Sequence, residues 1–569
     1  MRRWFWRLRH LPTEPVILHR SFAALRTIPL ILLAGLLALP VLALLAAWWP
    51  WGDGSAPTGA LLREMAATVL PGYIWTTLWL GLWVAVGAAV VGAATAAAVT
   101  LFEFPGRRMF EWLLLLPLAM PAYVTAYAYT DFLQFSGPLQ VGLRETFGLE
   151  GRLLPEVRSL WGAIWVFTFA LYPYVYLLAR TALGERAAHL MEAARLLGAP
   201  LSRRIATIAL PLARPAVAAG VALALMETLA DFGVTSYFGI QTFTTGILKA
   251  WLSMDNRLAA AQLATMLLAL VLLLLWLEHR AERRMRFTAK GVGHAGSSEA
   301  QPVALRGVAR MGAWSVCTVP VLMGFVAPVA FMLRPLAADW SVLPWERFLE
   351  WAWNSVRLGG ITAGLAVAMA LALAFAVRRR PDWLTRGVVQ LASVGYAVPG
   401  AVIVVGLLLP VGWVQERAPQ WGVGALVTTT ALGIIWAYLV RFCAVALQSV
   451  QSGYARIPIS LDDSARMLGA SSLRLMTQVH WPLLKRSTAA AALLVFVDVM
   501  KELPATMVLR PFNSDTLAVV AYQLARDERL GEAALPSLAL VAVGLVPVVL
   551  LSRTLRSRAP ARAARAASQ

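Results

Sequence analysis

The chain has 569 residues, of which 59% are hydrophobic and only 14% are charged. A soluble protein of this length would carry about 25% charged residues. The mean hydropathy of +0.67 comes from long apolar blocks, which are typical of membrane spans. The net charge of +20 comes from arginines clustered beside these blocks, so we expect contact with lipid headgroups and exclude nucleic acid as a partner.

Apolar blocks long enough to cross a hydrocarbon core as helices recur along the whole chain. We expect about twelve such spans, and therefore an all-α polytopic membrane protein, because no alternating pattern supports a closed barrel. In the first half, the spans cover 27–49, 74–101, 109–130, 159–182, 212–232 and 258–278. In the second half, they cover 311–334, 354–377, 385–410, 424–449, 487–505 and 534–552.

Positive charge orients these spans in the membrane. Segments after even-numbered spans are rich in arginine, whereas segments after odd-numbered spans are poorer in charge or balanced. Because Lys and Arg concentrate on cytoplasmic loops, we expect both termini in the cytoplasm. The parts are then a first repeat with a cytoplasmic N-terminal tail at 1–286, a flexible polar linker at 287–310 and a second repeat at 311–569.

Two charged, small-residue segments carry the internal repeat. They are LMEAARLLGAPLSRRIATIALPL from Leu190 and LDDSARMLGASSLRLMTQVHWPL from Leu461, so the offset is 271 residues. Farther upstream the repeat continues at an offset of 278, as Pro121 matches Pro399. Such a repeat indicates two copies of one unit. Six spans per copy place the halves parallel about an axis along the membrane normal, with a central path between them.

Each segment is predicted to form a short cytoplasmic helix, at 191–197 and 462–468. A glycine then ends the helix, and a proline suits the first turn of the span that follows. An ordinary cytoplasmic loop with an amphipathic helix is the plainer alternative. Two copies with the same spacing, at equivalent places in both halves, favour a shared function.

The first segment resembles the EAA loop of ABC importer permeases, and the second keeps the spacing with several other residue types. In that family the loop forms a coupling helix that docks into a cleft of the ATP-binding subunit. The resemblance implies the type I importer permease (MetI-like) fold and, from the departures, a weaker second contact. The ATPase-coupling positions that it implies are Glu192, Ala193, Ala194, Gly198 and Pro211 in the first copy and Asp463, Ala465, Gly469 and Pro482 in the second.

The chain has no GxxxxGK[ST] phosphate loop, so its energy is expected from a partner. The resemblance implies two ABC ATPase subunits that use ATP and Mg, and a periplasmic or extracellular substrate-binding protein. The chain itself is then a transport subunit of the bacterial inner membrane that binds no cofactor and is not an enzyme. A secondary transporter with 6+6 spans is the rival interpretation. It would need no docking loops, so the two matched segments argue against it.

The stretches after the two loops resemble the fused two-unit ferric-iron permeases of bacteria. They include ETLADFG from Glu227 and KELPAT from Lys501. The resemblance covers most of the chain and implies ferric iron as the cargo. Thiamine, polyamine and phosphonate permeases are similar in plan, so these cargoes remain alternatives.

Four acids in these stretches are candidates for the substrate path. Glu227 and Asp231 match Asp498 and Glu502 at the 271 offset. An acid at mid-bilayer costs about 2.5–3.5 kcal/mol on insertion scales, so it usually marks a path or a pair. Four carboxylates facing one axis would suit a hard trivalent cation. No metal site is assigned firmly, and no residue is assigned a catalytic role.

Local pairing is the plainer interpretation of these acids. Asp498 would then pair with Lys501, and Glu502 with Arg510, while Asp231 would be solvated at a span end. No catalytic constellation supports a membrane enzyme or scaffold. The two cysteines, at 317 and 443, lie inside apolar blocks and are too few for a thiolate metal site.

Overall fold

The computed structural model describes residues 16–48, 58–184, 188–289, 303–341 and 343–556. The first half of this part consists of helices joined by short turns, including one 3₁₀ helix (η1) and one π-helix (η3). Its elements are α1 Val16–Ala46, α2 Thr58–Ala67, α3 Leu70–Leu101, β1 Phe102–Glu103, α4 Arg107–Leu113, η1 Leu116–Ala119, α5 Ala122–Leu133, α6 Pro138–Phe147, α7 Leu160–Ala182, α8 Ala188–Leu196, α9 Leu201–Arg204, η3 Ile205–Ala209, α10 Leu210–Ala230, α11 Gly233–Tyr237, α12 Phe243–Leu252 and α13 Arg257–Ala289.

The second half repeats this order, with π-helices at η4 and η7 and 3₁₀ helices at η5 and η6. Its elements are β2 Val303–Ala304, α14 Val308–Val321, η4 Leu322–Val326, α15 Ala327–Ala338, α16 Trp345–Arg379, α17 Trp383–Val394, η5 Gly395–Ala397, α18 Gly400–Arg417, η6 Pro419–Trp421, α19 Val423–Thr429, α20 Leu432–Tyr454, α21 Ile459–Met467, α22 Ser472–Arg474, η7 Leu475–His480, α23 Trp481–Lys501, α24 Pro504–Leu509, α25 Leu517–Arg526 and α26 Leu530–Arg556.

The described residues contain ten helices long and apolar enough to cross a membrane, or eleven if the bent pair 107–119 and 122–147 is one span. The sequence predicts about twelve. The remaining one, expected at 487–505, is α23, a helix of 21 residues. It carries four charged side chains, which keep it out of the apolar set: Lys485, Arg486, Asp498 and Lys501. The fold is that of an all-α polytopic membrane protein.

The third span of each half is broken at a proline. In the first half the chain bends by 89° between η1 and α5, and in the second half η5 separates α17 from α18. Pro121 and Pro399 precede α5 and α18 with ψ values of 141° and 143°. Proline cannot donate the helical hydrogen bond, and its ring disfavours helical geometry before it. The repeat therefore places the same break in both halves.

The first span of each half packs against the other half. α1 lies on α17 and α18, while α14 and α15 lie on α3 and α5. Trp436 in α20 donates its indole N–H to the carbonyl of Leu36 in α1 at 2.8 Å. Tyr129 in α5 donates its hydroxyl to the carbonyl of Met323 in η4 at 2.7 Å. One continuous apolar core consequently includes helices of both repeats.

Part of the expected linker 287–310 is structured. α13 continues to Ala289, and β2 pairs in parallel with β1 at the end of α3. The Leu305 N–H donates to the Glu103 carbonyl at 3.0 Å, and α14 begins at Val308. Residues 290–302 lie outside the described residues, and the flexibility of the linker stays a prediction.

Candidate functional site

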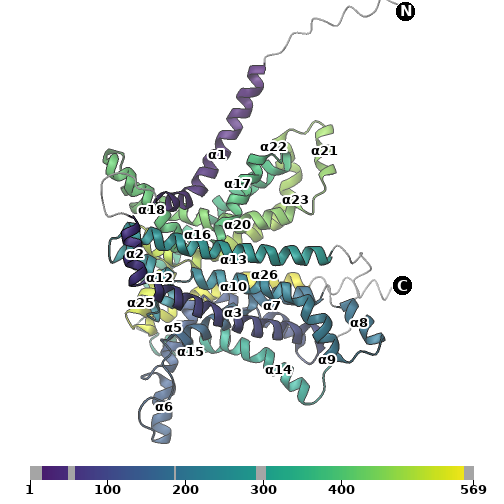
Figure 1. Cartoon of the computed structure of the whole chain (residues 1–569), viewed down its shortest axis with the longest axis vertical. Helices are drawn as coiled ribbons and strands as arrows, with labels where there is room; N and C mark the ends of the chain where they lie inside the picture. Colours follow the sequence, from purple (N-terminus) through teal and green to yellow (C-terminus); the bar gives the residue numbers. More distant parts are fainter. Residues whose placement is uncertain (1–15, 49–57, 185–187, 290–302, 342, 557–569) are drawn as a thin grey trace, which may run out of the picture.

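The two predicted cytoplasmic helices are α8 and α21, which lie beyond one end of the long helices, on the right of Figure 1. Gly198 and Gly469 follow them, and both have a φ of 79°. The next amide donates back five residues in each copy, from Ala199 to Ala194 and from Ala470 to Ala465, at 3.0 Å. Glycine tolerates this left-handed conformation, which ends the helix by a Schellman motif.

Each helix presents a pair of exposed apolar side chains at its C-terminal end. The pairs are Leu196–Leu197 and Met467–Leu468, and all four side chains are between 85% and 89% exposed. They are equivalent at the 271 offset. Contiguous exposed apolar groups outside the membrane spans indicate contact with a partner. The two ends are therefore alike in shape despite their different sequences.

The span after each helix begins earlier than the sequence predicts. Pro211 lies in the first turn of α10, as expected, but helical structure already precedes it, because residues 201–230 form one continuous helical span. A π-helical stretch, η3 or η7, directly precedes Pro211 and Pro482. This wider turn accommodates a proline, which cannot form the regular i to i−4 hydrogen bond. The stretch between each short helix and the following span is thus helical.

Two of the four candidate acids cap short helices. One Asp231 carboxylate oxygen accepts the Val234 N–H at 2.8 Å, at the start of α11. Glu502 accepts the N–H groups of Ala505 and Thr506 at 3.1 and 2.9 Å, at the start of α24. A carboxylate in this place satisfies amides that have no partner within the helix. Asp231 and Glu502 are thus equivalent in structure as well as in sequence.

Glu502 also forms an ion pair with Arg441 of α20, with a nitrogen–oxygen distance of 3.2 Å. The pair is almost fully buried. Arg510, the partner expected for Glu502, pairs with Asp515. The interpretation of Glu502 as a locally paired acid is therefore supported, but with a different cation.

Glu227 of α10 lies at the interface between the two halves. It accepts a hydrogen bond from the Tyr396 hydroxyl of η5 at 2.9 Å. A cavity of about 20 Å³ adjoins them, which is room for about one water molecule. Its walls come from both halves: Tyr174, Leu223, Met226, Glu227, Ala230, Tyr396, Ala397 and Arg441.

Asp498 of α23 lies within electrostatic range of Lys501, Glu227 and Arg441. The Lys501 ammonium donates to the Leu118 carbonyl of η1 at 2.9 Å, which joins the two halves. Arg441 and Lys501 correspond to alanines in the first half at the 271 offset. The acids therefore come from both halves, whereas their cations come from the second half alone.

The four acids do not form a preformed metal site. Among the described residues, no group of three or more His, Cys, Asp and Glu side chains is arranged to hold a metal ion. Asp231 and Glu502 serve as caps, whereas Glu227 and Asp498 do not cap a helix in this way.

Sequence reasoning missed three residues of this site: Arg441, Tyr396 and Tyr174. Arg441 could have been found, because it is a lone arginine inside the apolar run 424–449 and such a charge is costly in a membrane. The two tyrosines carry no such signal. They come from separate elements, and only the packing of the halves brings them together.

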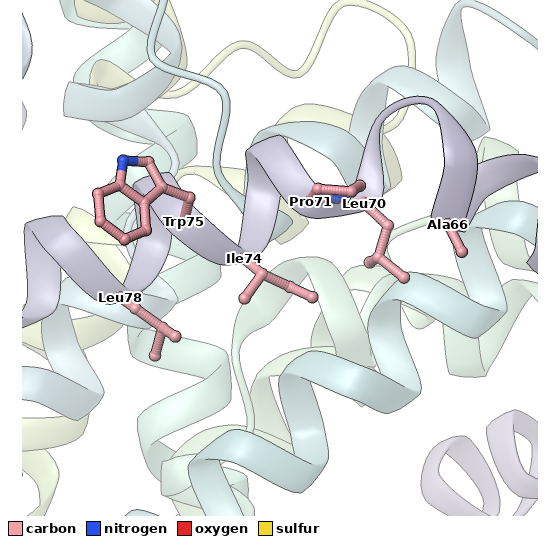
Figure 2. A pocket seen from close by; sticks show the side chains of 6 residues that line it. All are labelled: Ala66, Leu70, Pro71, Ile74, Trp75 and Leu78. Carbon is pink, nitrogen blue, oxygen red and sulfur yellow. The ribbon is translucent and has the colours of Figure 1, made fainter.

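A larger apolar hollow lies on the outer surface and is unrelated to these charges. It lies along α2 and α3 (Figure 2), and its volume is about 420 Å³. Only apolar side chains and a proline line it, so it offers nothing to bind a charged cargo. Its lining residues are Ala66, Leu70, Pro71, Ile74, Trp75 and Leu78.

Comparison with known proteins supports the division into two repeats. Residues 88–287 and 360–558 each match the family model described as binding-protein-dependent transport system inner membrane component. Together these stretches make up more than half of the chain. Each match lies in one of the two halves that the internal offset defines.

Curated relatives extend over most of the chain. The Fe(3+)-transport system permease protein FbpB 2 of Haemophilus influenzae is 26% identical over 466 residues, 79% of this chain and 84% of that protein. The probable ABC transporter permease protein y4fN of Sinorhizobium fredii is 24% identical over 516 residues, 85% of this chain and 87% of that protein. The ferric transport system permease protein FbpB of Actinobacillus pleuropneumoniae is 24% identical over 73% of this chain and 61% of that protein.

Proposed function

Because the chain belongs to the family of binding-protein-dependent transport system inner membrane components, we propose that it is the permease subunit of an ATP-driven ferric-iron importer. The observation that carries this proposal is the pair of equivalent helices α8 and α21, with their exposed apolar ends at one end of the bundle. The similarity to ferric permeases along most of the chain supports iron as the cargo.

In this proposal, two ABC ATPase subunits dock on α8 and α21 at the cytoplasmic face of the bacterial inner membrane. ATP and Mg are bound and used by those subunits. ATP binding draws the docking helices together, and the two halves change from an inward-facing to an outward-facing arrangement. A substrate-binding protein delivers the cargo at the opposite face, where α2, α12 and α25 lie on the left of Figure 1.

The cargo path runs between the halves, past Glu227 and Asp498. Carboxylate oxygens suit a hard trivalent cation. Arg441 and Lys501 lie near these acids and offset part of their charge, which keeps cargo binding weak enough for release. In the conformation observed, the space beside Glu227 has room for about one water molecule, so the path is closed there.

Uptake by cells lacking this chain tests the cargo. Loss of ferric-iron uptake, restored by the intact gene, is the expected result, with thiamine, a polyamine and a phosphonate as parallel cargoes. Loss of one of those uptakes instead would identify the other cargo.

The energy source is tested on membrane vesicles. Import that requires ATP, together with an ATPase that co-purifies with the chain, is expected. Import driven by a proton gradient without ATP would overturn the proposal in favour of a 6+6 secondary transporter.

A further inference from the structure

Beneath α21, four polar side chains from four elements form one hydrogen-bonded group, which we call the Asp462 cluster. It consists of Arg378 of α16, Tyr454 of α20, Asp462 of α21 and His480 of η7. Arg378 donates Nε and Nη2 to the two carboxylate oxygens of Asp462 at 2.8 and 2.9 Å. His480 Nε2 lies 3.0 Å from Asp462 Oδ1, and the Tyr454 hydroxyl lies 3.2 Å from His480 Nδ1.

The Asp462 cluster is shielded from water. Side-chain exposure is 11% for Arg378, 3% for Asp462 and 0% for His480. A two-pronged arginine–carboxylate contact fixes both distance and orientation. Removal of one partner would leave the other charge buried and uncompensated. The group therefore resists partial rearrangement.

Arg378 also fixes the chain that leads into α21. Its guanidinium donates to the carbonyls of Tyr454, Ile457 and Pro458 at 3.3, 3.0 and 3.1 Å. Carbonyls at the end of a helix such as α20 have no partner within it. One side chain at the end of α16 thus holds the end of α20, the turn and α21.

The first half holds its docking helix differently. The equivalents of the four residues there are Thr100, Leu183, Met191 and Ala209, by the 278 and 271 offsets. Met191, Leu183 and Ala209 are buried in an apolar cluster. Among the residues that the structure describes here, Arg204 donates a long hydrogen bond to the Met191 carbonyl, at 3.4 Å. Apolar contacts are non-directional, so they allow α8 to tilt or slide.

α16 connects the Asp462 cluster to the opposite face of the protein. Its 35 residues extend over about 50 Å as a helix. In the first third of α16, the Ser355 hydroxyl accepts the N–H of Leu517, the first residue of α25, at 2.9 Å. Tyr522 of α25 is hydrogen-bonded to Ser236 of α11, in the other half, at 2.8 Å. The helices α16 and α25, joined by these two hydrogen bonds, thus connect α21 to a contact between the halves.

We propose that the Asp462 cluster makes α21 and α16 move as one rigid body, so that the second docking helix transmits the ATPase motion directly while α8 yields to it. Asp462, Arg378, His480 and Tyr454 are positioning residues for this step, since none of them lies at the exposed end of α21. The inference rests on the proposed function, because it requires ATPases docked at α8 and α21. It reverses the expectation that the second copy, which departs from the family pattern, is the weaker one.

Two variants and one matched control test this inference on the complex purified with its ATPase and reconstituted with its binding protein. The first variant, Asp462→Asn, removes the charge and keeps the shape of the side chain. The control is Met191→Leu, an apolar change at the equivalent position of the first half. The second variant combines Arg378→Thr, Tyr454→Leu, Asp462→Met and His480→Ala. It installs the first half's residues and leaves no member of the Asp462 cluster charged and unpaired.

The measured quantity is the amount of ferric iron imported per ATP hydrolysed. The amount of ATPase that co-purifies is measured in the same preparations. For Asp462→Asn and the fourfold variant we expect this ratio to fall at least tenfold, with ATPase binding within twofold of wild type. Met191→Leu should leave the ratio unchanged. An unchanged ratio in the fourfold variant with its ATPase bound would overturn the inference and leave the proposed function standing. A wild-type chain without any bound ATPase would overturn the proposed function itself.

A measurement on the wild-type chain keeps the inference falsifiable if a variant fails to assemble. In the full chain without ATPase, backbone amides of α21 should exchange hydrogen at least tenfold more slowly than those of α8. Equal exchange in the two helices would show that the Asp462 cluster gives α21 no extra rigidity, and would overturn the inference.

Discussion

At the scale of single residues, the four candidate acids separate into two kinds with different consequences when altered. Glu227→Gln removes the charge but keeps a side-chain oxygen that can accept the hydrogen bond from the Tyr396 hydroxyl. That hydroxyl lies 2.9 Å from the Glu227 carboxylate. We expect iron uptake to fall at least tenfold, since the path loses a carboxylate, while the melting temperature stays within about 2 °C. Uptake assays and thermal unfolding of the purified chain measure the two effects. Unchanged uptake would remove Glu227 from the path.

For Glu502, in contrast to Glu227, we expect substitution to lower the stability of the folded chain. Glu502→Ala removes the cap of α24 and leaves Arg441 buried without its partner. Breaking a buried pair costs about 3–5 kcal/mol, and loss of a cap costs about 1 kcal/mol more. We expect a lower melting temperature and poor recovery from membranes. A variant as stable as wild type would contradict the structural role, and Arg510→Ala, at a separate ion pair, is the control.

The pH dependence of folding stability provides a prediction for Asp462. Burial alone would raise the pKa of this carboxyl, but hydrogen bonds from Arg378 and His480 outweigh it and lower the pKa below 3.8. A group with a lowered pKa stabilises the folded state above its unfolded pKa, and this contribution is lost as pH falls through the folded pKa. The stability difference between wild type and Asp462→Asn should stay constant above about pH 5 and shrink as the pH falls below 3.8. Denaturant unfolding at several pH values measures it, and a difference that shrinks between pH 8 and 6 would contradict this assignment.

At the scale of elements, the ends of α8 and α21 are alike although their sequences differ. Departures of the second copy from the family pattern predict that Gly198→Pro harms transport more than Gly469→Pro. Both glycines, however, have a φ of 79° and open space around the position of a Cβ atom. We therefore expect Gly198→Ala and Gly469→Ala to be equally harmful, each at about 1–2 kcal/mol for a left-handed alanine. Co-purified ATPase is the measure, and a severalfold difference between the two variants would show unequal docking.

Much of the element order was readable from the sequence, because the two offsets and the apolar blocks record local chemistry. The breaks before α5 and α18 follow from Pro121 and Pro399. The continuous span through Pro211 was not readable, since a π-helical turn leaves no residue signature. The Asp462 cluster could not be predicted from the sequence, for another reason. Its members come from four segments, and nothing in the sequence of one segment records which other segment covers it.

At the scale of the whole molecule, the two repeats are alike in sequence order but not in charge. Arg441, Lys501 and the Asp462 cluster belong to the second half, while the equivalent positions in the first half carry no charge. A pair of identical subunits could not divide these roles. Fusion into one chain permits one half to hold the counter-ions and, in the inference proposed above, the rigid docking helix, while the other half supplies the more compliant contact.

The crossed packing of the first spans leads to a prediction about cutting the chain. α1 lies on α17 and α18, and α15 lies on α5, so each half completes the other's core. Halves 1–296 and 297–569, expressed separately, should each expose this apolar surface and be degraded or aggregate. Expressed together, they should assemble and restore uptake, because the break falls outside the β1–β2 pairing at 102–103 and 303–304. Co-purification of two differently tagged halves measures assembly, and a single half that is stable and monodisperse would contradict the crossed packing.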